Sequence, residues 1–235
     1  MVKKYGKESD VSYALGATVT MELLKRRPEC VRAVYVSPKS KIDKAIELAE
    51  KNGIPVIESE KAFNILSPKE NCYVIGEFTK FETHISSDKD HVVLVNPSNG
   101  GNLGTIMRDV ACFDCCDLAV IRPAVDPFDP KTVRASMGAA FVINFEMFDS
   151  FDEYFQKHGV RKTVPFMLDG APLGKVKFDG STRYSLVFGN EATGLPRSFG
   201  RFDAVGIEQS DKADSLNLSS AVAIGLYKLS TEKKS

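Results

Sequence analysis

The sequence predicts an α/β protein in two parts, a small N-terminal α/β domain and a larger, doubly wound α/β domain with a parallel sheet. Short apolar runs alternate with segments of helical periodicity along the chain. After residue 90 the apolar runs become continuous, as expected of parallel strands that are covered on both faces. A polar stretch separates the two patterns. We therefore expect domains at residues 1–82 and 91–235, joined by a linker at residues 83–90.

In the first domain, helical and strand patterns follow one another at short intervals. Helical spacing of apolar residues predicts helices at residues 11–24, 42–52 and 62–66. Alternating or β-branched runs predict strands at residues 31–36, 54–57 and 72–76. Together these segments indicate a compact α/β unit.

In the second domain, apolar strands alternate with helices. The predicted strands are residues 92–95, 118–121, 164–168, 185–188 and 204–207. The predicted helices are residues 105–113, 131–137, 146–158 and 219–229. This alternation is typical of a doubly wound α/β sheet.

Composition narrows the class of protein. The 235 residues are 43% hydrophobic, which is enough for a packed core. No apolar run approaches the roughly 20 residues that cross a membrane, and the first six residues lack the apolar core of a signal peptide. We therefore expect a cytoplasmic protein without a membrane partner. Since 31 Lys and Arg balance 31 Asp and Glu, any nucleic-acid surface must be a local patch.

Basic residues gather at two places near the N-terminus. The first cluster is Lys3, Lys4 and Lys7, and the second is Lys25, Arg26, Arg27 and Arg32. Charge runs are commonly solvated surface, and they also bind phosphates. The second cluster is the candidate RNA-binding surface.

The five cysteines do not have the spacing of a disulfide framework, so we expect reduced thiols. Cys112, Cys115 and Cys116 have the spacing of half a metal site. No second Cys or His pair follows at ligand spacing, so we expect no metal.

The first of three motifs spans residues 96–108. A strand leads into a loop containing Gly100 and Gly101, and Asn102 is placed to cap a helix that contains Arg108. The spacing of a dinucleotide-binding Gly-x-Gly-x-x-Gly loop is absent. A plain strand-loop-helix turn explains the glycines and Asn102, but not an arginine in an otherwise apolar helical turn.

The second motif delivers Gly189, Asn190 and Glu191 to the carboxyl end of an apolar strand, where open α/β sheets bind ligands. Alternatively, Glu191 lies near a helix N-terminus, where negative charge is favoured. The third motif places Ser215 and Asn217 just before an apolar helix, which either residue could cap.

Together the three motifs resemble those of the SpoU/TrmH family, RNA ribose 2′-O-methyltransferases of the SPOUT class, over residues 90–230. The resemblance implies a C-terminal trefoil knot that binds S-adenosylmethionine, a homodimer, and an RNA substrate. We expect large-subunit ribosomal RNA, with transfer RNA as the alternative. Residues 13–81 resemble, in length and order of elements, the kink-turn-binding ribosomal proteins that precede this domain in some family members.

The resemblance also implies roles for individual residues. The implied catalytic residues are Asn102, Arg108, Glu191, Ser215 and Asn217. The implied cofactor-binding residues are Leu168, Gly189, Asn190, Ile207, Gln209 and Leu216. Arginine rarely gives up its proton, so we expect Arg108 to clamp the phosphate beside the target ribose rather than to act as a base.

One segment departs from the family pattern. Where the family usually has Ile-Pro-Met, this chain has Ile207, Glu208 and Gln209. The change leaves open an RNA-binding or assembly protein with weak catalysis. A small-molecule enzyme on a plain doubly wound fold would leave the three motifs unexplained.

Overall fold

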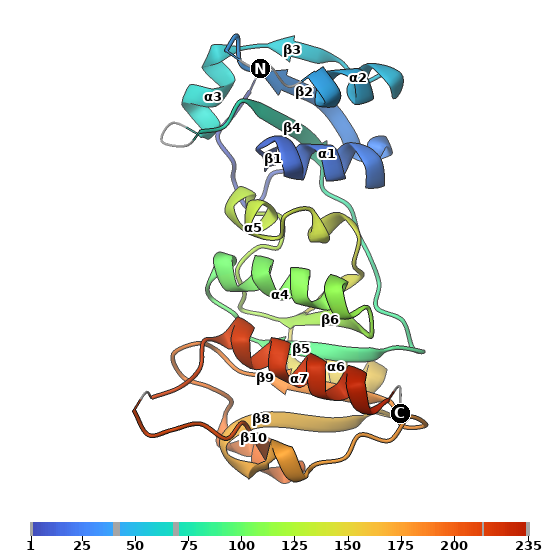
Figure 1. The fold of residues 1–235 in the computed structure, drawn as a ribbon, viewed down its shortest axis with the longest axis vertical. Helices are drawn as coiled ribbons and strands as arrows, with labels where there is room; N and C mark the ends of the chain where they lie inside the picture. Colours follow the sequence, from blue (N-terminus) through green and yellow to red (C-terminus); the bar gives the residue numbers. More distant parts are fainter. Residues whose placement is uncertain (1, 40–42, 68–70, 213, 234–235) are drawn as a thin grey trace. The chain divides into compact units, whose positions relative to one another are not determined.

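The computed structural model describes residues 2–39, 43–67, 71–212 and 214–233 (Figure 1). The chain divides into two compact units. Unit 1 comprises Met1–Glu82 and Asp126–Val142, and unit 2 comprises Thr83–Val125 and Ile143–Ser235. Each unit therefore contains two separate stretches of the chain, and residues 83–89 precede the first strand of unit 2.

The described residues of unit 1 form a four-stranded sheet in the order β1-β4-β2-β3. The strands are β1 (Val11–Leu15), β2 (Val31–Val36), β3 (Val56–Glu58) and β4 (Val74–Thr79). β4 is antiparallel to both neighbours, and β3 is parallel to β2. The helices are α1 (Ala17–Arg26), α2 (Asp43–Lys51), α3 (Glu60–Leu66), α5 (Pro130–Ala135) and the short 3-10 helices η1 (Pro28–Cys30) and η2 (Ala139–Phe141).

Alternation along β2 explains the two apolar layers of this sheet. Val34 packs with Leu24 of α1 and Ala45 of α2. Its neighbour Tyr35 packs on the other side with Phe63 of α3. Successive strand residues point to opposite faces, so each face acquires its own helical cover.

The predicted helix at residues 11–24 is wrong in its first third. Residues 11–15 form β1, which pairs with β4, and Gly16 has φ 102°, so the chain turns there before α1 begins. Pairing with β4 outweighs the local helical spacing. The strand predicted at residues 31–36 is confirmed as β2. The remaining predicted elements of this part are found with shifted ends, and residue 42 lies outside the described residues.

The segment Asp126–Val142 completes the core of unit 1. The Phe78 ring contacts the rings of Phe128 and Phe141, with centroids 6.1 and 5.3 Å apart. The Asp126 carboxylate accepts hydrogen bonds from the Tyr5 hydroxyl and from Lys80 Nζ. Local patterns cannot reveal that a segment after residue 120 belongs to this unit, because these contacts span long sequence separations.

The described residues of unit 2 form a six-stranded, parallel sheet in the order β10-β8-β9-β5-β6-β7. Its strands are β5 (Asp90–Val95), β6 (Cys116–Ile121), β7 (Phe145–Phe148), β8 (Lys162–Pro172), β9 (Tyr184–Phe188) and β10 (Val205–Gly206). Its helices are α4 (Gly100–Phe113), α6 (Phe151–His158), α7 (Leu218–Glu232), η3 (Leu173–Lys175) and η4 (Arg197–Arg201).

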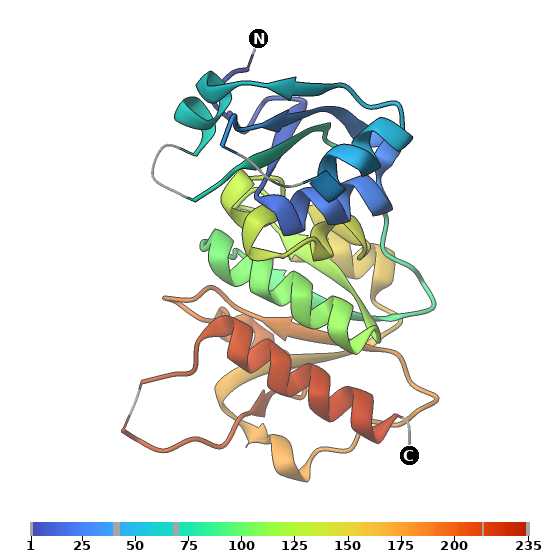
Figure 2. The ribbon, with the colours of Figure 1, turned by 45° about the horizontal axis from the view of Figure 1, so that its top comes forward.

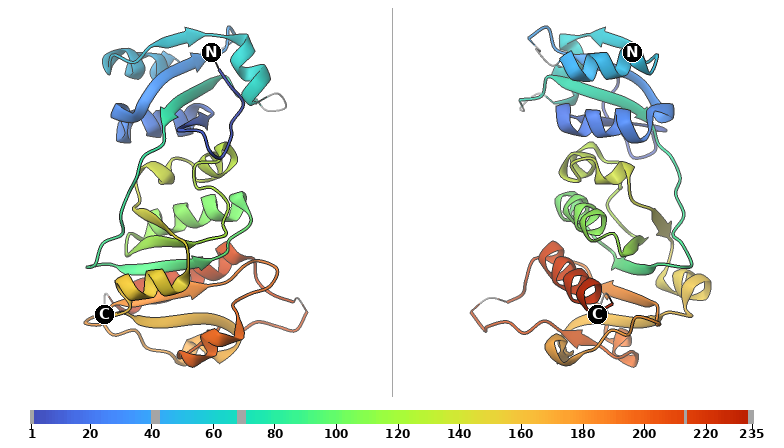
Figure 3. Two further views of the ribbon diagram at one scale, coloured as in Figure 1. Left: turned by 180° about the vertical axis from the view of Figure 1, so that it is seen from behind. Right: turned by 45° about the vertical axis from the view of Figure 1, so that its right-hand side comes forward.

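Helices cover both faces of this sheet, which confirms the predicted doubly wound parallel architecture. α4 and α7 run side by side on one face (Figure 2), and α6 lies on the opposite face (Figure 3). β5, β6 and β9 are buried along their whole length. Their continuous apolar runs follow from this cover.

The predicted helix at residues 146–158 is wrong at its start. Residues 145–148 form β7, which pairs with β6, and the Ser150 side chain caps α6 by accepting from the Glu153 N–H. The polar pair Asp149 and Ser150 marks the boundary, since serine is a favoured N-cap.

Among the described residues, no helix has the length and apolar character needed to cross a membrane. Within the same residues, no cluster of three His, Cys, Asp or Glu side chains is arranged to hold a metal ion.

Candidate cofactor and substrate site

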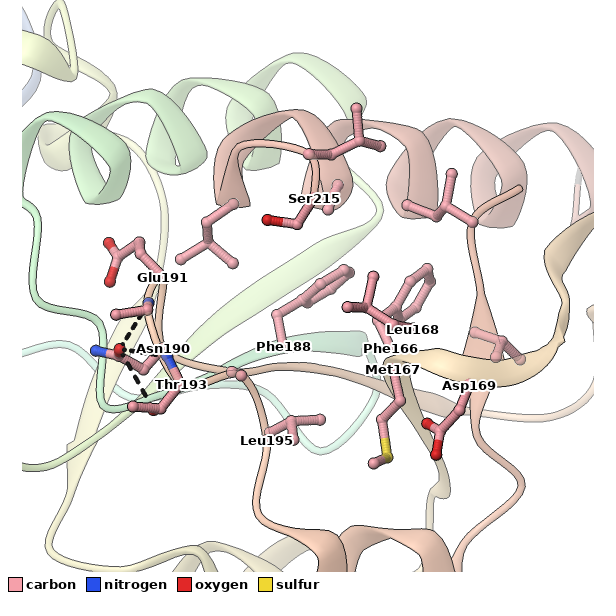
Figure 4. A pocket seen from close by; sticks show the side chains of 18 of the residues that line it. Phe166, Met167, Leu168, Asp169, Phe188, Asn190, Glu191, Thr193, Leu195 and Ser215 are labelled. Atoms are coloured by element: carbon pink, nitrogen blue, oxygen red, sulfur yellow. Dashed lines mark hydrogen bonds between the residues drawn. The ribbon is translucent and has the colours of Figure 1, made fainter. Parts of the chain in front are cut away.

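A cavity of about 340 Å³ lies in unit 2, between β8, the loop after β9, β10 and the start of α7 (Figure 4). This is where open parallel sheets bind ligands. Its apolar lining consists of Phe166, Met167, Leu168, Phe188, Leu195, Val205, Ile207, Leu216, Leu218 and Ala221. The rest of the lining is formed by Asp169, Gln209, Ser215 and the loop of residues 189–194.

Glu191 ties the first motif to the second. Its carboxylate accepts from the Ser98 N–H (3.0 Å), the Ser98 hydroxyl (2.8 Å) and the Asn99 N–H (3.1 Å). It also accepts from Asn102 Nδ2 at 3.1 Å. Four donors converge on one carboxylate, so Glu191 holds the loop before α4 in place.

Asn102 extends this network to the third motif. Its Oδ1 accepts from Asn217 Nδ2 at 3.1 Å. Asn217 Oδ1 in turn accepts from the Ser219 N–H at 2.9 Å and caps α7. A continuous path of hydrogen bonds therefore runs from Glu191 through Asn102 to the first turn of α7.

Two competing influences set the pKa of Glu191. Burial alone would raise it, but hydrogen bonds from the Ser98 N–H and the Asn102 amide outweigh burial. The pKa of Glu191 is consequently below its ordinary value. A carboxylate that remains ionised and saturated with donors positions other groups and is unsuited to act as a general base at neutral pH.

Asn102 and Glu191 differ in local structure from what the sequence predicts. Asn102 does not cap α4, because Asn99 does so, accepting from the Gly101 and Asn102 N–H groups at 2.8 and 3.1 Å. Glu191 does not precede a helix; it lies in a tight loop closed by a bridge between Asn190 and Gly194.

Asn190 shapes this loop from within. Its Oδ1 accepts from the Ala192 N–H at 2.9 Å, and its Nδ2 donates to the Asn96 carbonyl at 2.8 Å. Gly189 cannot carry a side chain, because a Cβ there would lie 2.2 Å from the Gly194 carbonyl carbon. The glycine in the second motif thus permits two backbone segments to meet.

All six residues assigned to the cofactor by resemblance line the cavity: Leu168, Gly189, Asn190, Ile207, Gln209 and Leu216. Glu191 and Ser215 also line it. Motif reasoning missed Phe166, Phe188 and Asp169, which lie on strands β8 and β9 outside the loops. An apolar strand that ends at a loop motif is the signal that could have identified Phe188.

Arg108 is not brought to the cavity. It is exposed on α4 and has no hydrogen bond or ion pair among the described residues. Asn102 and Asn217 belong to the hydrogen-bond network but do not line the cavity either. The structure therefore joins Asn102, Glu191 and Asn217, and leaves Arg108 apart.

Glu208 lies outside the cavity, although its two neighbours line it. Its carboxylate accepts from the Gly174 N–H at 3.3 Å and so contacts η3 instead. The departure from the family pattern therefore places only the Gln209 amide, and no charge from Glu208, at the cavity.

The charged side chains that line the cavity are negative. Asp169 and Glu191 line it, and no Lys, Arg or His among the described residues does so. These carboxylates would attract a positively charged ligand, and no cation in the lining would repel it.

The candidate RNA-binding residues of unit 1 each have a partner. Lys25 and Arg26 pair with Glu22 at 2.9 and 3.6 Å. Arg32 pairs with Glu77 at 3.5 Å. Arg27 Nε donates to the Phe141 carbonyl at 3.3 Å, and the Arg27 guanidinium lies over the Phe81 ring. Lys25, Arg26 and Arg32 remain about half exposed. Their binding to RNA stays a prediction.

Known proteins match both parts of the chain. The 23S rRNA (guanosine(2553)-2′-O)-methyltransferase RlmP of Bacillus subtilis is 27% identical over 229 residues, 91% of this chain and 86% of that protein. An uncharacterized tRNA/rRNA methyltransferase of Synechocystis is 28% identical over 141 residues, 58% of this chain. The chain spans about half of that relative's length, 51%.

A solved structure and a family model agree with these matches. The AdoMet-bound rRNA methyltransferase from Sinorhizobium meliloti has a TM-score of 0.79 at 26% identity, covering 94% of this chain and 87% of that one. The model of the SpoU rRNA Methylase family matches residues 89–227, more than half of the chain. The chain belongs to the SpoU rRNA methylase family, a family of RNA methyltransferases.

Proposed function

We propose that this protein transfers a methyl group from S-adenosylmethionine to a ribose 2′-hydroxyl in structured RNA. The observation that supports it most is the path of hydrogen bonds from Glu191 through Asn102 to Asn217. This path joins three motifs, far apart in sequence, beside a cavity with two carboxylates and no cation. Related proteins named as RNA methyltransferases support the same reaction.

The residues of the cavity fit this cofactor. Phe166, Leu168, Phe188 and Leu216 offer an apolar surface for a flat purine ring. Asp169 and Glu191 favour a ligand with positive charge, and Gln209 and Ser215 add hydrogen-bonding groups. When bound, S-adenosylmethionine supplies a methyl group attached to positively charged sulfur, so no metal is needed to activate it.

Arg108 would act on the RNA. Its guanidinium has no ion pair among the described residues and is therefore available to a phosphate. A bidentate contact to the phosphate beside the target ribose would fix the hydroxyl and stabilise developing negative charge on oxygen. We expect Arg108→Lys, which keeps the charge but loses the planar fork, to reduce kcat strongly. Nearly full turnover of Arg108→Lys would refute the clamp.

We also propose that the protein acts as a homodimer. Arg108 does not line the cavity of its own chain, and in a homodimer Arg108 of the second subunit would complete each site. Ile224 and Tyr227 of α7 are 37% and 62% exposed and offer an apolar contact surface. We also propose that this part of the chain forms a trefoil knot. The support is that the chain returns from β10 to place Asn217 against Asn102.

We propose large-subunit ribosomal RNA as the substrate, with transfer RNA as the alternative. RlmP matches along nearly the whole chain and is named for 23S rRNA. The Synechocystis relative is named for both RNAs. Unit 1, through Lys25, Arg26, Arg27 and Arg32, would bind the RNA.

Calorimetry and a transfer assay together test this function. The unmodified protein should bind S-adenosylmethionine and S-adenosylhomocysteine, because Glu208 lies outside the cavity. Of the two substitutions that restore the family residues, Glu208→Pro should therefore change the affinity little, whereas Gln209→Met removes an amide that lines the cavity. Transfer to unmethylated ribosomal RNA should exceed transfer to transfer RNA. Cofactor binding only after restoration, with RNA bound but not methylated, would indicate an RNA-binding protein without turnover.

A further inference from the structure

A second cavity adjoins the first in unit 2. It measures about 480 Å³ and is lined by Val95, Asn96, Pro97, Ser98, Pro123, Ala124, Val125, Asn190, Thr193, Gly194 and Pro196. Asn190, Thr193 and Gly194 also line the cofactor cavity. The loop after β9 is thus a common wall between the two cavities.

The lining of the second cavity differs in chemistry from that of the first. Pro97, Pro123 and Pro196 line it together with aliphatic side chains, and the remaining side chains are amides and hydroxyls. No charged residue lines it in the described part of the chain, whereas Asp169 and Glu191 line the cofactor cavity. This second cavity suits a neutral, flat group with apolar faces and polar edges, which describes a nucleobase.

Asn96 offers a hydrogen-bonding edge in this cavity. Its φ of 57° is in the left-handed region, and the backbone is held by Asn96 N–H donating to the Ile121 carbonyl at 3.0 Å. Its carbonyl accepts from Asn190 Nδ2 at 2.8 Å. Its side-chain amide has no hydrogen bond among the described residues. Such an amide can donate to and accept from the edge of a base.

Two arginines are sequence neighbours of prolines that line the second cavity. Arg122 precedes Pro123, and its side chain is 48% exposed and pairs with Asp149 at 2.7 Å. Arg197 follows Pro196, is exposed, and has no ion pair within the described ranges. Exposed arginines beside an uncharged cavity fit the phosphates on either side of a base.

We infer that the second cavity binds one unstacked nucleobase of the RNA substrate. The inference rests on the proposed function and adds to it a subsite for recognition of the base. A base in this cavity places its own ribose near the shared wall, beside the cofactor cavity. RNA enzymes commonly read bases that are splayed out of a helix, because only these expose their faces and their Watson–Crick edges.

Methyl NMR of the full-length protein tests the subsite directly. The probes are the four nucleoside 5′-monophosphates, and ribose 5-phosphate is the control ligand. Binding of a base should shift the methyl signals of Val95, Ala124 and Val125 with at least one monophosphate and not with ribose 5-phosphate. Affinity for S-adenosylmethionine is measured on the same sample by calorimetry.

Two variants and a control make the test specific. Ala124→Trp fills the cavity and should weaken monophosphate binding at least tenfold. Asn96→Gly removes the amide, tolerates the positive φ, and should weaken binding about fivefold or more. Val160→Trp introduces the same indole ring at a residue that is 99% exposed and should change nothing. All three variants should bind S-adenosylmethionine like the unmodified protein.

Three outcomes would overturn the inference while leaving the methyltransferase proposal standing. The first is no response of the methyl signals to any monophosphate, and the second is an equal shift of these signals by ribose 5-phosphate. The third is a shift of the same signals by S-adenosylmethionine in competition with the monophosphates, which would assign the cavity to the cofactor. Failure of S-adenosylmethionine to bind at all would instead refute the proposed function.

Discussion

At the scale of single residues, Glu191 illustrates how a motif residue can act by holding others. Ser98, Asn99 and Asn102 supply four hydrogen-bond donors to its carboxylate. A glutamine amide in its place can accept hydrogen bonds only through its oxygen, and its NH₂ group would face other donors. The network, more than any one contact, places the first and third motifs beside the cavity.

We therefore expect Glu191→Gln to destabilise the protein by about 1–2 kcal/mol. This value is at the low end for hydrogen bonds to a charged group, because the loop is partly exposed to solvent. Affinity for S-adenosylmethionine should fall as well. Urea unfolding and calorimetry measure the two effects. The control is Glu153→Gln, since Glu153 accepts from the Asp149 N–H and an amide oxygen can replace it. Equal effects of the two substitutions would show that Glu191 does not hold the loop before α4 in place.

The same network implies a dependence on pH. The pKa of Glu191 is lower in the folded protein than its ordinary value. Its contribution to stability is therefore complete above the ordinary glutamate pKa of about 4.3 and is lost as the pH falls through the lower, folded pKa.

His91 provides a separate pH-sensitive group in the core of unit 2. It is fully buried, with Nε2 2.9 Å from the Ser86 carbonyl and Nδ1 2.9 Å from the Tyr154 hydroxyl. A carbonyl only accepts, so Nε2 carries the proton and Tyr154 donates to Nδ1. The Tyr154 oxygen can then accept from Ser185, 2.6 Å away. Burial lowers the pKa of His91 to about 3.

Unfolding should therefore become easier as the pH falls below about 6.5, the ordinary histidine pKa. The unfolded chain binds a proton there that folded His91 does not, at up to about 1.4 kcal/mol per pH unit. Urea titrations at pH 7, 6 and 5 measure the free energy of unfolding. His91→Gln should have a lower free energy of unfolding than the unmodified protein at pH 7, and this free energy should fall less per pH unit. His84→Gln, at an exposed side chain, should match the unmodified protein. Parallel pH curves for His91→Gln and the unmodified protein would count against this account.

At the scale of elements, the packing of α7 on the sheet shapes the cofactor cavity. Gly225 of α7 faces Phe166 of β8 and Phe188 of β9, and a Cβ there would lie 2.9 and 3.1 Å from the ends of these rings. The two rings are stacked, with centroids 4.3 Å apart, and both line the cavity. Any displacement of the rings therefore changes the cavity.

We expect Gly225→Val to cost about 1–3 kcal/mol through overpacking and to weaken S-adenosylmethionine binding at least tenfold. Thermal unfolding and calorimetry measure both quantities. Ala223→Val changes the same helix at a partly exposed residue and serves as the control. Normal cofactor affinity in Gly225→Val would show that the rings do not shape the site.

At the scale of the whole molecule, unit 1 depends on a distant part of the chain. Phe128 and Phe141 pack against Phe78, and Asp126 accepts from Lys80. A fragment of residues 1–82 lacks all three of these partners.

The fragment of residues 1–82 should therefore be unstable in isolation, because it exposes Phe78 to water. Adding a peptide of residues 126–142 in trans should increase its stability, with a peptide carrying Phe128→Ser and Phe141→Ser as the control. Circular dichroism and thermal unfolding measure the change. A cooperative melt of the fragment alone, unaffected by the peptide, would show that residues 1–82 form an independent domain.

Much of this architecture could be predicted because local patterns determine it. Continuous apolar runs indicated the parallel sheet of unit 2, and three motifs indicated the residues of its cavity. The rest depends on contacts between distant residues. No local pattern distinguishes β1 from a helix, assigns residues 126–142 to unit 1, or shows that Asn99 caps α4 while Asn102 bonds to Glu191.

The fate of a tritiated methyl group shows directly whether the protein methylates a ribose 2′-oxygen. S-adenosylmethionine labelled in its methyl group is incubated with the protein and unmethylated ribosomal RNA, which is then hydrolysed in alkali. A methylated 2′-oxygen cannot attack the neighbouring phosphodiester, so label on ribose should remain in alkali-resistant dinucleotides and be lost in Arg108→Lys. Label recovered in mononucleotides, as for a methylated base, or no label in RNA, would contradict the account.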